Sequence, residues 1–122
     1  MKDDSHVLIG TRIEFDKEKI EREGRYIYPA LIKRLDYIAE HFGLEVLESG
    51  HLYGNKKDMM YHDSDMAMTL TMSYLTKCRW FMENVKVWDV SFDYMSGEER
   101  GWDSALDEIN QLSLMEVTTY VE

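Results

Sequence analysis

The sequence has very little cysteine and proline. Among its 122 residues there is one cysteine, Cys78, and one proline, Pro29. A single cysteine excludes an intramolecular disulfide and a C-x-x-C zinc or redox motif. Lys77 and Arg79 flank Cys78, but on a strand both would point away from its thiol, so we interpret Cys78 as a small, inert, buried hydrophobic residue.

Long apolar runs are also missing. The longest are far too short to cross a bilayer, so we expect no membrane contact. Residues 1–5 are polar after the first methionine and lead into only three apolar residues, unlike a signal peptide. These absences predict a cytoplasmic protein. With 44% hydrophobic residues, the chain is long enough for residues 1–122 to form a single domain with its own core.

Basic residues are scarce in the last third of the chain. Residues 1–86 hold 13 basic and 15 acidic side chains, a net charge of −2, whereas residues 87–122 hold nine acidic side chains and only Arg100, a net charge of −8. No basic stripe is present, which argues against direct binding of nucleic acid through its phosphates. An acidic surface attracts basic proteins instead.

The motifs of common active sites are absent as well. Neither G-x-G-x-x-G nor G-x-x-x-x-G-K-[ST] occurs, so no phosphate-binding loop is predicted, and there is no G-x-S-x-G nucleophile elbow. We therefore expect no cofactor, and an enzymatic function is the less favoured interpretation.

Hydrophobic periodicity predicts two helical regions and several strands. A stripe of apolar residues with spacings of three and four predicts a helix over residues 17–42, capped by Asp16, broken near residue 28 by Pro29 and ended by Gly43. Gly24 lies on that stripe and suggests a close approach of two backbones. A second helix is predicted over residues 102–112, capped by Asp103 or Ser104. The predicted strands cover residues 7–15, 44–53, 59–62, 66–76, 85–95 and 114–121.

Residues 66–76 allow two interpretations. Five large apolar side chains alternate with Ala, Thr and Ser, a period of two that favours a strand. Ser64 and Asp65 are also good capping residues for a helix over 64–83. We favour the strand, with Met66, Met68 and Met72 on one face; that face, if exposed, would be a dimer or partner interface.

The predicted order of elements indicates an α+β fold. Consecutive strands without helices between them imply antiparallel pairing. We predict an antiparallel sheet of about five strands with two helices packed on one face, a ferredoxin-like variant with extra strands. The alternative, with residues 64–83 helical, gives an alternating α/β order.

The acidic last third contains the candidate binding site. The carboxylates of a strand, the loop after it and the next helix are expected to meet on one surface, with a tryptophan among them as an anchor. The predicted partner-binding residues are Asp89, Asp93, Glu98, Glu99, Trp102, Asp103, Asp107 and Glu108. Two other interpretations remain open: a solvated acidic face that keeps the protein soluble, and, less favoured, a Ca²⁺ or Mg²⁺ site, for which the spacing of a calcium loop is missing.

Two functions compete with protein binding. His51 and His62, in a loop with Asp63 and Asp65, suggest a small ligand-binding or metal-binding domain or an enzyme, although their spacing matches no metal signature. A structural homo-oligomer is the other alternative. We favour a small acidic intracellular domain that covers a basic partner surface, as an inhibitor or an immunity or anti-defence protein does.

Overall fold

The computed structural model describes residues 9–55, 61–91 and 102–107, and for residues 61–65 it describes the backbone alone. The elements in chain order are β1 (Gly10–Phe15), α1 (Lys17–Glu23), α2 (Tyr28–His41), β2 (Glu45–Glu48), β3 (Leu52–Gly54), α3 (Tyr61–Thr76), α4 (Arg79–Met82), β4 (Val85–Ser91) and β5 (Asp103–Ser104).

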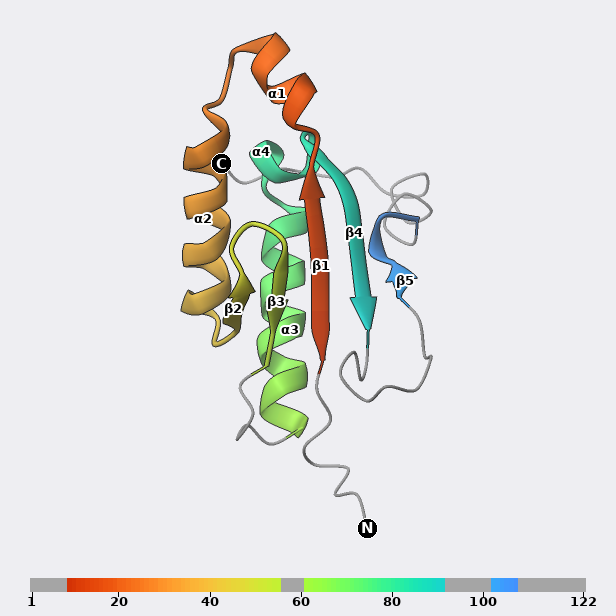
Figure 1. The fold of residues 1–122 in the computed structure, drawn as a ribbon. Coiled ribbons are helices and arrows are strands. Elements are labelled where there is room, and N and C mark those ends of the chain that lie inside the picture. Colours follow the sequence, from red (N-terminus) through yellow and green to blue (C-terminus); the bar gives the residue numbers. More distant parts are fainter. Residues whose placement is uncertain (1–8, 56–60, 92–101, 108–122) are drawn as a thin grey trace.

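The five strands form one antiparallel sheet in the order β2-β3-β1-β4-β5. From β1 to β4 the chain follows the β-α-β-β-α-β path of ferredoxin-like folds, with β3 and β1 in the middle of four strands. β5 adds a short strand beside β4. Figure 1 shows α2 and α3 on the same side of the sheet. The predicted α+β fold, an antiparallel five-stranded sheet in a ferredoxin-like variant, is confirmed.

The first helical segment is broken where the sequence predicts. The carboxylate of Asp16 accepts the backbone N–H of Lys19 at 3.1 Å and caps α1, and Pro29 lies in the first turn of α2. Gly24 ends α1 with a φ of 67°, a left-handed conformation that suits glycine. The expected close approach at Gly24 is wrong, because a Cβ added there would meet no atom within 4 Å.

The prediction of a strand over residues 66–76 is wrong. The alternative, a helix over residues 64–83, is correct in its secondary structure, although its bounds differ. Residues 61–76 form α3, and the short helix α4 follows after a turn. Among residues 66–76 of α3, whose side chains are described, the buried ones are Ala67, Met68, Thr71 and Leu75, and their spacing is that of a helix face. In the sequence, Thr71 fits a polar position on a strand. In the structure, its hydroxyl donates to the carbonyl of Ala67 at 2.8 Å inside the helix.

The single strand predicted over residues 44–53 is in fact a hairpin. The chain turns between β2 and β3 at Gly50, which has a φ of 75°. The carboxylate of Asp36 on α2 accepts hydrogen bonds from the Ser49 hydroxyl and, at 3.1 Å, from the Gly50 N–H. A Cβ at Gly50 would lie 2.5 Å from the side chain of Ile32, so the turn packs closely on α2.

The C-terminal elements differ in part from the prediction. The strand predicted over 85–95 is present from Val85 to Ser91, with Trp88 fully buried. The helix predicted over 102–112 does not include residues 102–104, because Asp103–Ser104 pairs with β4 as β5, but the predicted cap at Ser104 is confirmed. A helical turn follows, and Ser104 caps it by accepting the N–H of Asp107 at 3.2 Å. Residues 92–95, 108–112 and 114–121 lie outside the described part, and so do residues 59 and 60 of the short strand predicted over 59–62, whose last two residues begin α3.

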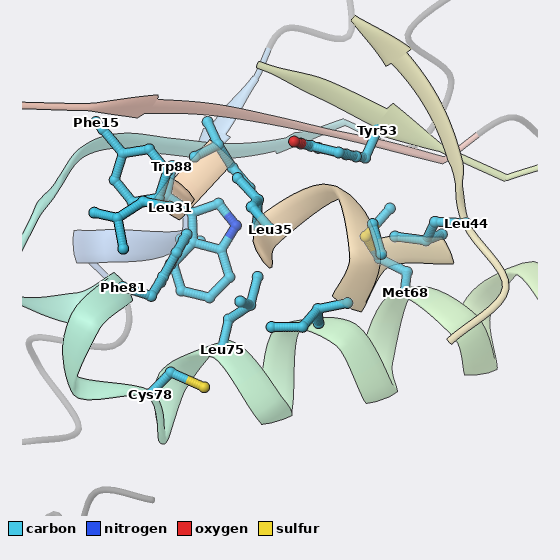
Figure 2. Close-up of a cluster of buried hydrophobic side chains, with 14 of the residues drawn as sticks. Phe15, Leu31, Leu35, Leu44, Tyr53, Met68, Leu75, Cys78, Phe81 and Trp88 are labelled. Carbon is cyan, nitrogen blue, oxygen red and sulfur yellow. The ribbon is translucent and has the colours of Figure 1, made fainter. Parts of the chain in front are cut away.

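The core lies between the sheet and the helices (Figure 2). At its centre the ring of Phe81 packs edge-on against Trp88, with 4.9 Å between the ring centroids, and against Phe15 at 5.7 Å. From α3, Met68 and Leu75 point into this layer. In the described ranges, no helix is long and apolar enough to cross a membrane.

Candidate partner-binding surface

Four of the eight predicted binding residues lie in the described part of the chain. Asp89 lies on β4, Asp103 on β5, and Trp102 and Asp107 lie on either side of β5. The pairing of β4 with β5 brings these four residues to one edge of the sheet (Figure 1). Asp93, Glu98, Glu99 and Glu108 lie outside the described residues, so their place in the surface stays a prediction.

Asp89 is paired within the chain. Arg12 lies opposite it across the β1–β4 ladder, and its Nη2 and Nε atoms are 2.7 and 3.2 Å from the same oxygen, Oδ2. The Asp89 side chain is 16% exposed and the Arg12 side chain 37%. This pair neutralises Asp89, which therefore offers a partner little free charge.

Arg12 also holds Trp102. Its guanidinium carbon lies 4.6 Å from the centroid of the indole ring, the geometry of a cation–π contact. One arginine on β1 therefore reaches across β4 and fixes the residue that precedes β5. Sequence reasoning missed Arg12, because no local signal links it to Asp89 and Trp102, which lie 77 and 90 positions later in the chain.

Asp103 and Asp107 are different from Asp89. Both are exposed, and within the described residues neither forms an ion pair. The cap at Ser104 fixes the turn that carries Asp107, because its hydroxyl oxygen accepts the backbone N–H of that residue. Two uncompensated carboxylates therefore stand on a fixed backbone at the β5 edge, beside a half-buried tryptophan ring.

Two basic residues in and after α1 form ion pairs away from the β5 edge. Arg25 pairs with Glu23 at 3.6 Å and with Glu83 at 3.1 Å, and these carboxylates raise its pKa. Lys17 lies 4.0 Å from Glu21 within α1. In the described structure, the acidic edge at β5 is therefore not neutralised by α1 or α2.

The two histidines of the alternative site are held in different elements. His51 lies in the turn between β2 and β3, where its Nδ1 is 2.8 Å from the carbonyl oxygen of Ile13. His62 lies in the first turn of α3, which begins at the other end of the hairpin (Figure 1). Among the described residues, no group of three His, Cys, Asp or Glu side chains is arranged to hold a metal ion.

Cys78 is buried, as the sequence predicts. Its side chain lies at the junction of α3 and α4, and its Sγ is 3.3 Å from the carbonyl oxygen of Tyr74. Burial raises the pKa of the thiol, although the positive charge of Arg34 acts in the opposite direction. A protonated, enclosed thiol is a poor nucleophile.

A second polar cluster, missed from the sequence, joins α2 to the hairpin. The buried hydroxyl of Tyr53 donates to the Asp36 carboxylate at 2.5 Å and accepts the Gly50 N–H at 2.8 Å. Burial, followed by the hydrogen bond to Asp36, raises the pKa of Tyr53 above its ordinary value. Because Tyr53 is only 1% exposed, we assign this cluster to holding the hairpin in place.

Comparison of the chain with protein families, curated proteins and solved structures finds no match to any of them. The function is therefore argued from the surface described above.

Proposed function

We propose that this chain is a protein-binding domain that holds a basic partner against the β5 edge of its sheet. The observation that carries the proposal is the pair of exposed carboxylates, Asp103 and Asp107, which have no ion-pair partner in the described structure. Trp102 lies beside them in a fixed position and supplies the aromatic anchor that protein interfaces commonly use.

The charge distribution supports a strongly basic partner. The excess of eight negative charges after residue 86 produces a field that steers a cationic protein toward this end of the chain. Proteins that bind nucleic acid have cationic grooves, and an acidic surface attracts such grooves. An inhibitory role follows, in which the domain covers such a groove as an immunity or anti-defence protein does.

The test compares the two edges of the sheet. Asp103→Lys with Asp107→Lys reverses the β5 edge, and Glu45→Lys with Glu48→Lys reverses two exposed carboxylates on β2 at the opposite edge. Each double variant changes the net charge from −10 to −6, so overall charge is matched. Wild type and both variants are used as bait for proteins from the source organism at low and at high salt.

We expect a basic protein to be retained by the wild type and by the β2-edge variant, and to be lost from the β5-edge variant and at high salt. With the purified partner, the β5-edge variant should slow association by about tenfold or more, because electrostatic steering acts mainly on the association rate. Equal association rates for the two variants contradict the proposal.

A further inference from the structure

An exposed apolar stripe runs along the outer side of α3. Met66, Leu70 and Tyr74 are 53%, 44% and 40% exposed, and their spacing of four residues places them on one line along the helix. We define these three residues as the α3 stripe. The opposite side of the same helix is buried in the core (Figure 2).

Aromatic contacts extend the α3 stripe onto α2. Tyr74 lies 5.5 Å from Phe42, Phe42 lies 5.2 Å from His41, and His41 stacks on Tyr37 at 6.0 Å, all measured between ring centroids. Tyr37 is 69% exposed. The exposed residues of the α3 stripe are thus joined through ring contacts to an exposed tyrosine of α2, unlike apolar residues that are scattered singly over a surface.

The charge of the chain indicates which partner covers the α3 stripe. The sequence has no charged residue from Met66 to Thr76, although the whole chain has a net charge of −10. A basic partner finds no carboxylate on the α3 stripe, whereas two copies of this acidic chain repel each other least where their contact surface is uncharged. A self-complementary apolar surface is also what a two-fold interface requires.

We propose that the α3 stripe is the two-fold interface of a homodimer, in which the α3 helices of two copies pack antiparallel about Leu70. In that register Met66 of one copy lies against Tyr74 of the other, because both are four residues from Leu70. Position 77, a lysine, then lies level with position 63 of the other copy, an aspartate. Each end of the interface therefore brings together two residues of opposite formal charge, which favours the antiparallel arrangement.

The test is sedimentation equilibrium of the full chain from low-micromolar to sub-millimolar concentration. We expect a monomer–dimer equilibrium for the wild type. Leu70→Glu should raise the dimer dissociation constant by about tenfold or more, because the substitution occurs twice at the axis and places two carboxylates against each other. Its fold should be retained, since Leu70 is already 44% exposed and glutamate is a good helix former.

Leu47→Glu is the matched control. Leu47 is 40% exposed on β2, outside the α3 stripe, and its substitution adds the same charge. This variant should dimerise like the wild type. A wild type that stays monomeric at every concentration overturns the proposal, and so does an equal effect of the two substitutions.

Exchanging charges tests the antiparallel register. Asp63→Lys alone should weaken the dimer several-fold, and adding Lys77→Asp should restore it, because the pair of opposite charges is re-formed in reverse. Failure of the second change to restore the dimer contradicts this register.

Discussion

The phenol of Tyr53 is buried against a carboxylate, so the protein is more stable while this phenol is protonated. Its pKa is raised in the folded protein, whereas in the unfolded chain it has the ordinary value of about 10. The stabilising contribution is complete below pH 10 and is lost as the pH rises further, because the unfolded chain then releases a proton that the folded protein keeps. Removing the hydroxyl with Tyr53→Phe should remove this dependence.

We therefore expect the free energy of unfolding of the wild type to fall more steeply above pH 10 than that of Tyr53→Phe, by up to about 1.4 kcal/mol per pH unit. At pH 7 the variant should be less stable by about 1–3 kcal/mol, because Asp36 and the Gly50 N–H lose a partner. Denaturant unfolding followed by tryptophan fluorescence measures both. Parallel curves above pH 10 would show that Tyr53 titrates normally in the folded protein.

At the level of the element, α3 places two methionines that are two residues apart in opposite environments. Met68 is 4% exposed and Met66 is 53% exposed. We expect Met68→Ala to reduce the free energy of unfolding by about 2–5 kcal/mol, because it leaves a cavity in the core. Met66→Ala should change it by less than about 0.5 kcal/mol, as measured by denaturant unfolding at low protein concentration.

This pair of variants separates a helix from a strand. On a strand, residues 66 and 68 point to the same face, so their substitutions would cost similar amounts. Equal losses of stability for Met66→Ala and Met68→Ala contradict the helical assignment of this segment.

The predictability of each element follows from how local its signals are. The start of α1 and the break before α2 are predictable, because the cap at Asp16 and the proline at residue 29 each act within one turn. The α3 segment is not, because alternation of large and small residues is compatible with both periods until Thr71 is known to bond inside the helix. The β2–β3 hairpin is missed because its turn at Gly50 is held by Asp36, a residue 14 positions away.

For the candidate site, the sequence predicts the excess of acidic residues but does not predict which of them form ion pairs. The excess of acidic residues after position 86 is visible by counting, and the exposed carboxylates of Asp103 and Asp107 agree with it. The pairing of Asp89 with Arg12 depends on β1 lying beside β4, a contact between residues 77 positions apart. Long-range pairing of this kind decides which acidic residues keep their charge free for a partner, and composition alone does not show it.

At the scale of the whole molecule, salt is expected to have opposite effects on thermal stability and on binding, because the charge is unevenly distributed. Arg12 neutralises Asp89, but the other eight acidic residues of the last third have only Arg100 among them in the sequence, so their excess negative charge opposes the compact state. Salt screens this repulsion, since the screening length falls from about 10 Å at 0.1 M to about 3 Å at 1 M. Sodium chloride should therefore raise the melting temperature, although it weakens attraction to a basic partner.

Asp103→Asn with Asp107→Asn tests whether the β5 edge contributes to that repulsion. The double variant keeps the shape of both side chains and changes the net charge from −10 to −8. At low salt it should melt at a higher temperature than the wild type, and its melting temperature should rise less with salt, because less repulsion remains to be screened. Calorimetry over a series of salt concentrations measures both. A variant that melts at a lower temperature than the wild type would show that these carboxylates stabilise the fold, and they would then not be the free charges that a partner needs.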